Sequence, residues 1–599
     1  MPAYTSAAAH TFHIPIMGTG FTIDTPLKVA KYGISSSISL VDDVLIEQMR
    51  KYHCQKAGEP YEEISKQSDD PRAHRITAYL DLLDRLVQQQ VKELQNSPFE
   101  QGSEITKYYE MLPDEVPLKK KYLDMLTMSD VAQQKSMQDM LRASAVPGSI
   151  DVNIMTKLDR DQYRKGEKLP PKYADALSAL RGFAQSTLSA SIIFSAGINK
   201  RLYRYMTEFD DFFPDQNGEM KKRIILKVSD HRSSEIQGRF LAKLGLWVSE
   251  FRIESGLNCG GHAFASKGFL LGVVLDEFKQ KKNELLGKLI PMYRKALSAK
   301  GDFADYTPED FRITVQGGVG TAGEQQFLLK YYGVDSVGWG TPFMLVPEAV
   351  RMDKVNLKRL AEASGKDVYL SDASPLGVPF WNLRTSSSEE ARRRRIKDGK
   401  PGTSCPKGFV AGSTEFTERP ICLASRAYQK MKFEHLQEEE HSLQALNKIK
   451  ERILAKSCIC HDLAGNATVA LGIEPSATSA VCCGPGIVDF SKIATLQEMV
   501  DHIYGRLSLL TSSERPHMFI RELSLYIDYL RKELDNLPVG LASNSASFLE
   551  GMRENLFKGI EYYQTLSSQL VEDSREKFLT ELKKMEAALE PLFIEKANM

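Results

Sequence analysis

The fold is decided by the stretch FRITVQGGVGTAGEQQFLLKYYGVDSVGWGTPFM, residues 311–344. It reads as a β-branched strand that ends in glycines, a helical segment, and a second strand that ends in Gly-Thr. Gly318, Gly320 and Gly323 form a Gly-x-Gly-x-x-Gly run. Such a run opens the dinucleotide-binding Rossmann unit, but glycine-rich loops also bind phosphate in other α/β folds. The rest of the chain decides between the two.

Runs of the same strand type recur along the first 350 residues and alternate with helical segments. They are nearly continuous in apolar character, which is typical of buried parallel strands. The pattern predicts a (β/α)8 TIM barrel. A helical insertion at about 42–148 follows the second strand, and we expect it to cover or border the catalytic face. The predicted strands are 12–17, 33–40, 149–155, 189–195, 223–229, 246–253, 311–316 and 335–340.

The barrel reading also explains the glycines. A Rossmann unit needs an acidic residue at the end of the next strand, about 20 residues on, but here that strand ends in Gly340-Thr341 and Asp335 stands at its start. In (β/α)8 enzymes the loops after strands seven and eight commonly bind a phosphate. Gly317-Gly318 end strand seven, and glycine lets the backbone approach the ligand closely. We therefore expect a phosphate cradle at these two strand ends.

The composition is that of a folded protein, with 42% hydrophobic and 26% charged residues. Lys+Arg and Asp+Glu both number 78, so no net charge favours nucleic acid or an anionic membrane as a partner. No secretory leader or long apolar run is evident, and eight cysteines are too sparse for a disulfide scaffold, so we expect a cytoplasmic setting. Three regions are predicted: a barrel at 1–365, a Cys-rich linker or metal-binding segment at 366–490, and a helical C-terminal domain at 491–599.

Five short motifs stand in a fixed order at the strand ends. Together they resemble the nitronate monooxygenase family, also called 2-nitropropane dioxygenase-like, whose members are FMN-binding TIM barrels and include flavin-type enoyl-ACP reductases. The resemblance covers about residues 12–350. The motifs are Ile14-Pro15-Ile16-Met17-Gly18, Val152-Asn153, Gly260-Gly261-His262, Gly317-Gly318-Val319 and Gly340-Thr341-Pro342-Phe343.

The resemblance implies a flavin site. Met17 and Gly18 would line the flavin, and Asn153 would bond near its ring or ribityl chain. His262 would be the general acid or base, a role that suits an imidazole with a pKa near 6.5. Lys227, at the end of strand five, has the charge to stabilise a reduced, anionic flavin. The phosphate would be held by Gly261, Gly317, Gly318, Gly340 and Thr341.

Three functions follow from these features. The first is an FMN-dependent oxidoreductase of the nitronate monooxygenase type, acting on a small-molecule substrate. The second is a flavin-dependent enoyl reductase acting on a carrier-bound acyl chain, with an acyl-carrier or electron-donor protein as partner. The third is a non-catalytic barrel used as a binding or assembly module. Asn258-Cys259 stand where the family usually has Glu-Ala, which leaves the substrate class open.

The Cys-rich segment allows a second cofactor. Four thiolates brought together by tight turns could hold an iron–sulfur cluster or a zinc ion. Their spacing matches no standard ferredoxin or zinc-ribbon pattern, and scattered buried thiols are the alternative. The residues concerned are Cys405, Cys422, Cys458, Cys460, Cys482 and Cys483.

Overall fold

The computed structural model describes residues 9–592, apart from 157, 196, 259–265, 301–305, 307, 309–310, 405, 439–440 and 571. Eight parallel strands close into a barrel in the order β1-β2-β3-β6-β7-β8-β9-β10. Each observed strand overlaps a predicted one, so the (β/α)8 fold is confirmed. The strands are β1 (Phe12–Ile14), β2 (Ser35–Ser39), β3 (Ile150–Ile154), β6 (Ala190–Phe194), β7 (Lys222–Val228), β8 (Val248–Glu254), β9 (Arg312–Gln316) and β10 (Ser336–Gly338).

Helices surround the barrel. The longest of these outer helices is α11 (Leu271–Ser298), and α12 (Ala322–Tyr331) joins the last two strands. The others are α1 (Gly18–Phe21), α2 (Pro26–Val29), α8 (Asp175–Gln185), α9 (Lys200–Tyr205) and α10 (His231–Ala242), and a small hairpin of β4 (Tyr163–Arg164) and β5 (Glu167–Lys168) lies between β3 and α8. The first and last strands are in register, with His13 opposite Gly338 and Gly338 opposite Gln316. The carboxyl ends of β1, β10 and β9 therefore lie next to one another.

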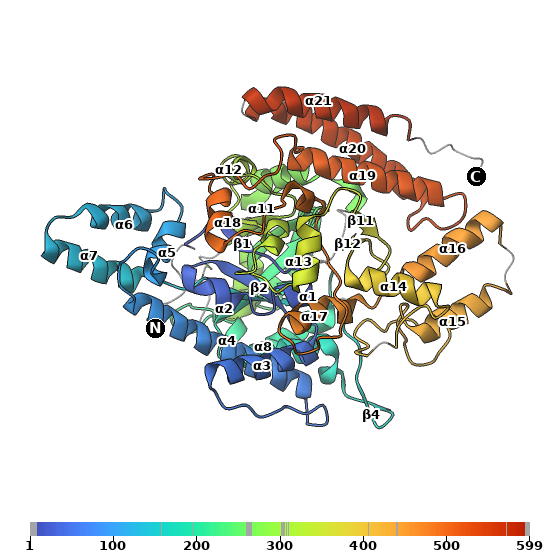
Figure 1. Cartoon of the computed structure of the whole chain (residues 1–599), viewed down its shortest axis with the longest axis horizontal. Helices are drawn as coiled ribbons and strands as arrows, with labels where there is room; N and C mark the ends of the chain where they lie inside the picture. Colours follow the sequence, from blue (N-terminus) through green and yellow to red (C-terminus); the bar gives the residue numbers. More distant parts are fainter. Residues whose placement is uncertain are drawn as a thin grey trace.

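The predicted insertion is helical. Its helices α3 (Asp43–Ala57) and α4 (Pro71–Asn96) lie against the barrel, and α4 packs on α8 so closely that a Cβ at Gly182 would lie 2.6 Å from the carbonyl oxygen of Ala73. In Figure 1 the remaining helices extend outward as an arm. They are α5 (Glu104–Met111), α6 (Pro117–Thr127) and α7 (Val131–Ser144).

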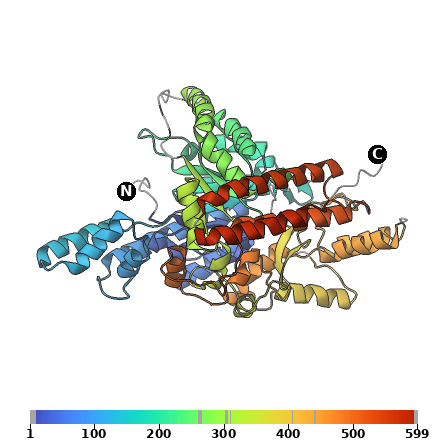
Figure 2. The ribbon, with the colours of Figure 1, turned by 90° about the horizontal axis from the view of Figure 1, so that it is seen from above.

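The C-terminal half wraps around the same barrel. Helix α17 (Ile459–Ala470) packs against α1, at the carboxyl end of β1, and a Cβ at Gly20 would lie only 2.4 Å from the carbonyl oxygen of Leu463. Figures 1 and 2 show α19 (Met518–Asn536), α20 (Ala546–Leu566) and α21 (Glu572–Leu589) as a layer of long helices on one side of the barrel. The other elements are α13 (Lys354–Ala361), β11 (Val368–Ser371), β12 (Phe380–Leu383), α14 (Ser387–Lys397), α15 (Arg426–His435), α16 (Leu443–Ala455) and α18 (Leu496–Ile503).

One hydrophobic core joins these regions. It includes barrel residues such as Ile14 and Trp339 together with Leu463 of α17 and Leu523 of α19. Burial of apolar side chains is the main favourable contribution to folding, so the C-terminal helices and the barrel stabilise one another. The boundaries at 365 and 490 stay predictions.

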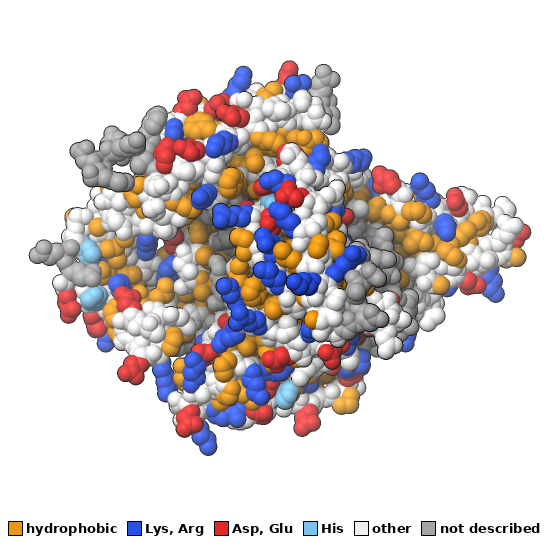
Figure 3. All heavy atoms as spheres, turned by 180° about the vertical axis from the view of Figure 1, so that it is seen from behind, with side chains coloured by type: hydrophobic (Ala, Val, Ile, Leu, Met, Phe, Trp, Pro, Cys, Tyr) orange, Lys and Arg blue, Asp and Glu red, His pale blue; other side chains and the backbone are white. Residues whose placement is uncertain are grey.

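Charged groups occupy the lower interior of the barrel. The buried Arg252 pairs with Glu250 at 2.8 Å, and Arg312, which is 45% exposed, pairs with the same carboxylate at 3.1 Å. Buried charges need such partners because desolvation is otherwise too costly. On the surface, Figure 3 shows acidic and basic side chains both spread over the face behind that of Figure 1, with Lys and Arg gathered near its middle. Among the described residues, no helix combines the length and apolar character needed to span a bilayer.

Candidate functional site

The two strand ends singled out in the sequence meet at one cavity. Gly317, Gly318, Gly340 and Thr341 all line it, so the loops after β9 and β10 face the same space at the carboxyl end of the barrel. Gly317 and Gly318 have φ of 109° and 88°, which L side chains rarely adopt. A Cβ at Gly318 would also lie 2.6 Å from Leu257 Cδ1. Glycine is therefore required here for both backbone conformation and space.

Four of the backbone N–H groups at this cavity have no acceptor in the part of the chain that the structure describes. Among the described residues, none accepts a hydrogen bond from the N–H groups of Gly318, Val319, Gly340 or Thr341. Thr321 caps the nearby helix α12, whose N-terminus adds a positive dipole end. Donors and dipole together make this an anion-binding environment. We call this cavity, together with Gly318, Val319, Gly340 and Thr341, the cradle.

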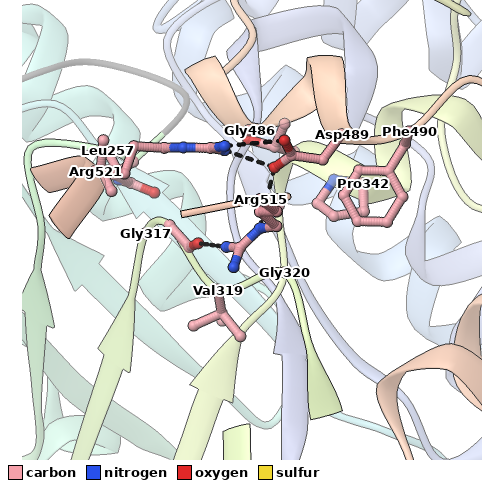
Figure 4. A pocket seen from close by; sticks show the side chains of 15 residues that line it. Leu257, Gly317, Val319, Gly320, Pro342, Gly486, Asp489, Phe490, Arg515 and Arg521 are labelled. Carbon is pink, nitrogen blue, oxygen red and sulfur yellow. Dashed lines mark hydrogen bonds and ion pairs between the residues drawn. The ribbon is translucent and has the colours of Figure 1, made fainter. Parts of the chain in front are cut away.

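Two arginines from the C-terminal region complete the cradle. Figure 4 shows Arg515 lying against the glycine loop and Arg521 reaching toward Asp489. The Arg515 guanidinium donates to the carbonyl oxygen of Gly318 at 2.8 Å and pairs with Glu324 at 2.5 Å and Asp489 at 3.0 Å. Arg521 binds both oxygens of Asp489, at 2.6 and 2.9 Å. The space left among these groups is about 20 Å³, enough for a water-sized group.

The ionisation of this network follows from its contacts. Burial opposes the charge of Arg515, but Glu324 and Asp489 outweigh it, and the pKa of Arg515 is raised. Burial likewise opposes the charge of Glu324, yet Arg515 and the N–H of Gly320 hold its pKa below the ordinary value. Gly320 has a separate role, because a Cβ there would lie 2.8 Å from the Arg515 guanidinium. That glycine makes room for an arginine rather than directly for a phosphate.

A polar layer lies beside the cradle, at the ends of β7, β8 and β9. Glu254 accepts hydrogen bonds from Gln316 at 2.7 Å and from Asn258 at 2.8 Å, and pairs with Lys227 at 3.2 Å. Asn258 also lines the cradle cavity. Lys227 is thus connected to the cradle through Glu254 and Asn258, and it is almost fully buried.

The remaining predicted flavin contacts lie on β3 and after β1. Asn153 is buried on β3, and its Oδ1 has no hydrogen-bond partner among the described residues. A buried amide oxygen without a partner is costly, and a bound ligand that donates a hydrogen bond would satisfy it. Met17 and Gly18 are fully covered, and Gly18, with φ of 54°, lies under Leu463 of α17. None of these three residues lines the cradle cavity.

His262 and Gly261 lie outside the described residues, but the two ends of their connection are described. β8 ends at Glu254 and α11 begins at Leu271. Glu522 of α19 joins these ends, accepting from Ser255 Oγ and from the N–H of Leu271, both at 2.7 Å. Burial raises the pKa of this carboxyl to about 7.

The cysteines of the C-terminal half divide between two hydrophobic clusters. Cys422, Cys458 and Cys460 share one with Val410 and Ala424, whereas Cys482 and Cys483 belong to the main core. Cys405 lies outside the described residues. In the described part of the chain, no three His, Cys, Asp or Glu side chains are arranged to hold a metal ion. A hydrogen bond with Cys458, burial and the neighbouring thiols raise the pKa of Cys460. A metal centre at these cysteines stays a prediction.

Several site residues were not singled out from the sequence. Glu254 and Gln316 end their strands, and a polar residue at that position of a barrel strand is a signal of function. Arg515 and Arg521 carried no local signal, because they reach the cradle from far along the chain. The insertion at 42–148, expected to border the site, contributes no residue to the cradle cavity.

Comparisons with known proteins assign the chain to no family. No model of a protein family and no curated protein matches the chain. Among solved structures, the chain is similar to the enoyl reductase domain of MlnA from the macrolactin biosynthesis cluster from Bacillus amyloliquefaciens, with 15% identity and a TM-score of 0.32. That match covers 70% of this chain and 88% of the other. A likeness at this level carries no argument about the fold or the activity of this chain.

Proposed function

We propose that this protein is an FMN-dependent oxidoreductase. The observation that carries the proposal is the meeting of the β9 and β10 ends at one cradle of free backbone N–H groups. In (β/α)8 enzymes this position commonly binds a phosphate. The motifs at the ends of β1 and β3, which resemble the nitronate monooxygenase family, extend the site from the phosphate toward a flavin ring.

The residues of the cradle suit the phosphate of such a ligand. The cradle N–H groups of Gly318 and Thr341 can donate to a phosphate monoester, and the unpartnered Oδ1 of Asn153 can accept from a flavin N–H. Lys227 supplies a buried cation close to the barrel mouth. When bound, FMN supplies hydride or electron transfer. The cavity is small at present, so a phosphate needs the side chain of Arg521 at its edge to shift outward.

The protein groups have separate tasks in this proposal. Lys227, held by Glu254, stabilises negative charge that develops at its end of the barrel mouth. His262 moves the substrate proton, a role that rests on the family resemblance. Helix α17 and the surrounding core keep water away from the apolar side of the carboxyl end of the barrel. The exclusion of water strengthens the electrostatic interactions of Lys227.

Two reactions fit this site. One is oxidation of a small acidic carbon compound, as in nitronate monooxygenases. The other is reduction of a conjugated carbon–carbon bond on a carrier-bound acyl chain, with an acyl-carrier or electron-donor protein as partner. The alternative is not an enzymatic function: the barrel would serve as a non-catalytic module for binding or assembly.

The first experiment is the absorbance spectrum of the purified full chain, followed by titration with FMN. We expect flavin bands or submicromolar FMN binding. Gly318→Val should abolish binding, because its side chain would fill the cradle and clash with Leu257. The matched control is Gly365→Val, since Gly365 has open space where its Cβ would stand. If wild-type protein neither carries nor binds FMN, the proposal is wrong and the non-catalytic reading gains.

A further inference from the structure

We propose that Arg515 and Arg521, from the C-terminal region, bind the phosphate of the ligand in the cradle, with Asp489 holding them ready. This inference rests on the proposed function and deepens it: the anion site is built jointly by the barrel and by helix α19 together with the segment leading into it. Both guanidinium groups line the same cavity as Gly318 and Thr341.

The geometry places unused donors at the cavity. An arginine carries five N–H donors. Arg515 spends one on Gly318, one on Glu324 and one on Asp489, and Arg521 spends two on Asp489. Guanidinium groups match phosphate oxygens in a two-pronged geometry, which makes arginine the preferred side chain for such ligands.

The two arginines are held differently. Arg515 is anchored on three sides, and only 5% of its side chain is exposed. Arg521 is 14% exposed and has Asp489 as its ion-pair partner among the described residues. Arg521 can therefore leave Asp489 and make room for a phosphate, while Arg515 stays in place. Asp489 keeps both groups near the cavity before the ligand arrives.

The charges also decide which ligand fits. The ionised side chains lining the cavity are two guanidinium groups and one carboxylate, and the buried carboxylate of Glu324 brings the net charge of this network to zero, so a phosphate is favoured by the N–H donors that these groups offer rather than by excess positive charge. Glu324 balances Arg515 from behind. An uncharged alcohol in the same place would gain little from the arginines, whereas a phosphate monoester gains from both. The cradle should therefore distinguish FMN from riboflavin, which lacks the phosphate.

The test compares these two flavins on the full-length protein. Dissociation constants for FMN and riboflavin are measured by fluorescence titration for wild type, Arg521→Gln, Arg521→Lys and the control Arg531→Gln. Arg531 lies on the same helix, but it is exposed and paired only locally, with Asp528. Wild type and control should prefer FMN. Arg521→Gln should reduce that preference about ten- to hundredfold, the range for a lost hydrogen bond to a charged group, and Arg521→Lys should restore part of it.

The outcomes separate the two proposals. If Arg521→Gln keeps the full preference for FMN, or lowers the affinity for FMN and riboflavin equally, then Arg521 does not bind the phosphate. In that case this inference fails, while the flavin proposal stands. If wild type binds neither flavin, the proposed function itself fails, and the inference fails with it. If Arg521→Gln loses the preference for FMN while its affinity for riboflavin is unchanged, both the inference and the proposed function are supported.

Discussion

Glu522→Gln should change how the stability of the protein depends on pH. The carboxyl is 1% exposed and accepts hydrogen bonds from Ser255 and from the backbone of Leu271. Burial raises its pKa from 4.5 to about 7. Because the folded pKa lies above the unfolded one, the stability contributed by Glu522 is fully present below pH 4.5. It is lost as the pH rises through 7.

The size of the effect follows from that shift. At 1.36 kcal/mol per pKa unit, a rise from 4.5 to about 7 corresponds to about 3 kcal/mol. Glutamine stays neutral at every pH but offers only one acceptor oxygen, so the variant loses one hydrogen bond, worth about 1 kcal/mol. We expect Glu522→Gln to be less stable than wild type near pH 4.5 and more stable above pH 7.5.

The assay is chemical or thermal unfolding of both proteins between pH 4.5 and 8.5. Glu554→Gln, an exposed position on α20, is the control and should follow wild type throughout. A stability difference between Glu522→Gln and wild type that does not change with pH would refute the reasoning. It would mean that Glu522 holds the same charge in the folded and unfolded chain over this range.

Three further predictions concern charge and metal. Arg515→Met leaves the buried carboxylate of Glu324 without its cation, and should destabilise the protein by about 3–5 kcal/mol in denaturant titrations; an unchanged midpoint would contradict this. Lys227→Met removes the cation beside Glu254 and should lower the reduction potential of bound flavin, on the order of tens of millivolts by spectroelectrochemistry; a potential equal to wild type would show that Lys227 does not act on the flavin. If the cysteines hold iron or zinc, Cys458→Ser should lose it by elemental analysis of protein purified without oxygen, whereas equal metal content in both proteins would rule Cys458 out as a ligand.

The barrel could be predicted from the sequence because its signals are local. Each strand is a short β-branched run that ends near a glycine or a polar residue, and such runs need no knowledge of distant partners. The glycines at 317–318 and 340 could be placed at one cavity for the same reason: strand order in a (β/α)8 barrel puts consecutive ends together. Within the described residues these glycines line one cavity, while their role in binding a ligand stays a proposal.

The rest of the site depends on contacts between distant parts of the chain. Arg515 reaches Gly318 across almost 200 positions, and no pattern in the segment before α19 distinguishes it from an ordinary surface arginine. Gly320 belongs to the Gly-x-Gly-x-x-Gly run of the sequence, and its missing side chain makes room for that arginine. Glu254 and Gln316 could have been found, because both are polar residues at strand ends.

The contact between Gly20 and α17 has a consequence for biosynthesis. The barrel strands leave the ribosome well before α17 does, and at about 5–20 residues per second the delay is on the order of ten seconds. During that interval the surface at Gly18 and Gly20 lacks the cover that Leu463 of α17 later gives it, and it is open to aggregation or to a chaperone. Nascent chains stalled before α17 should therefore be more sensitive to protease than full-length chains, although every barrel strand is already made.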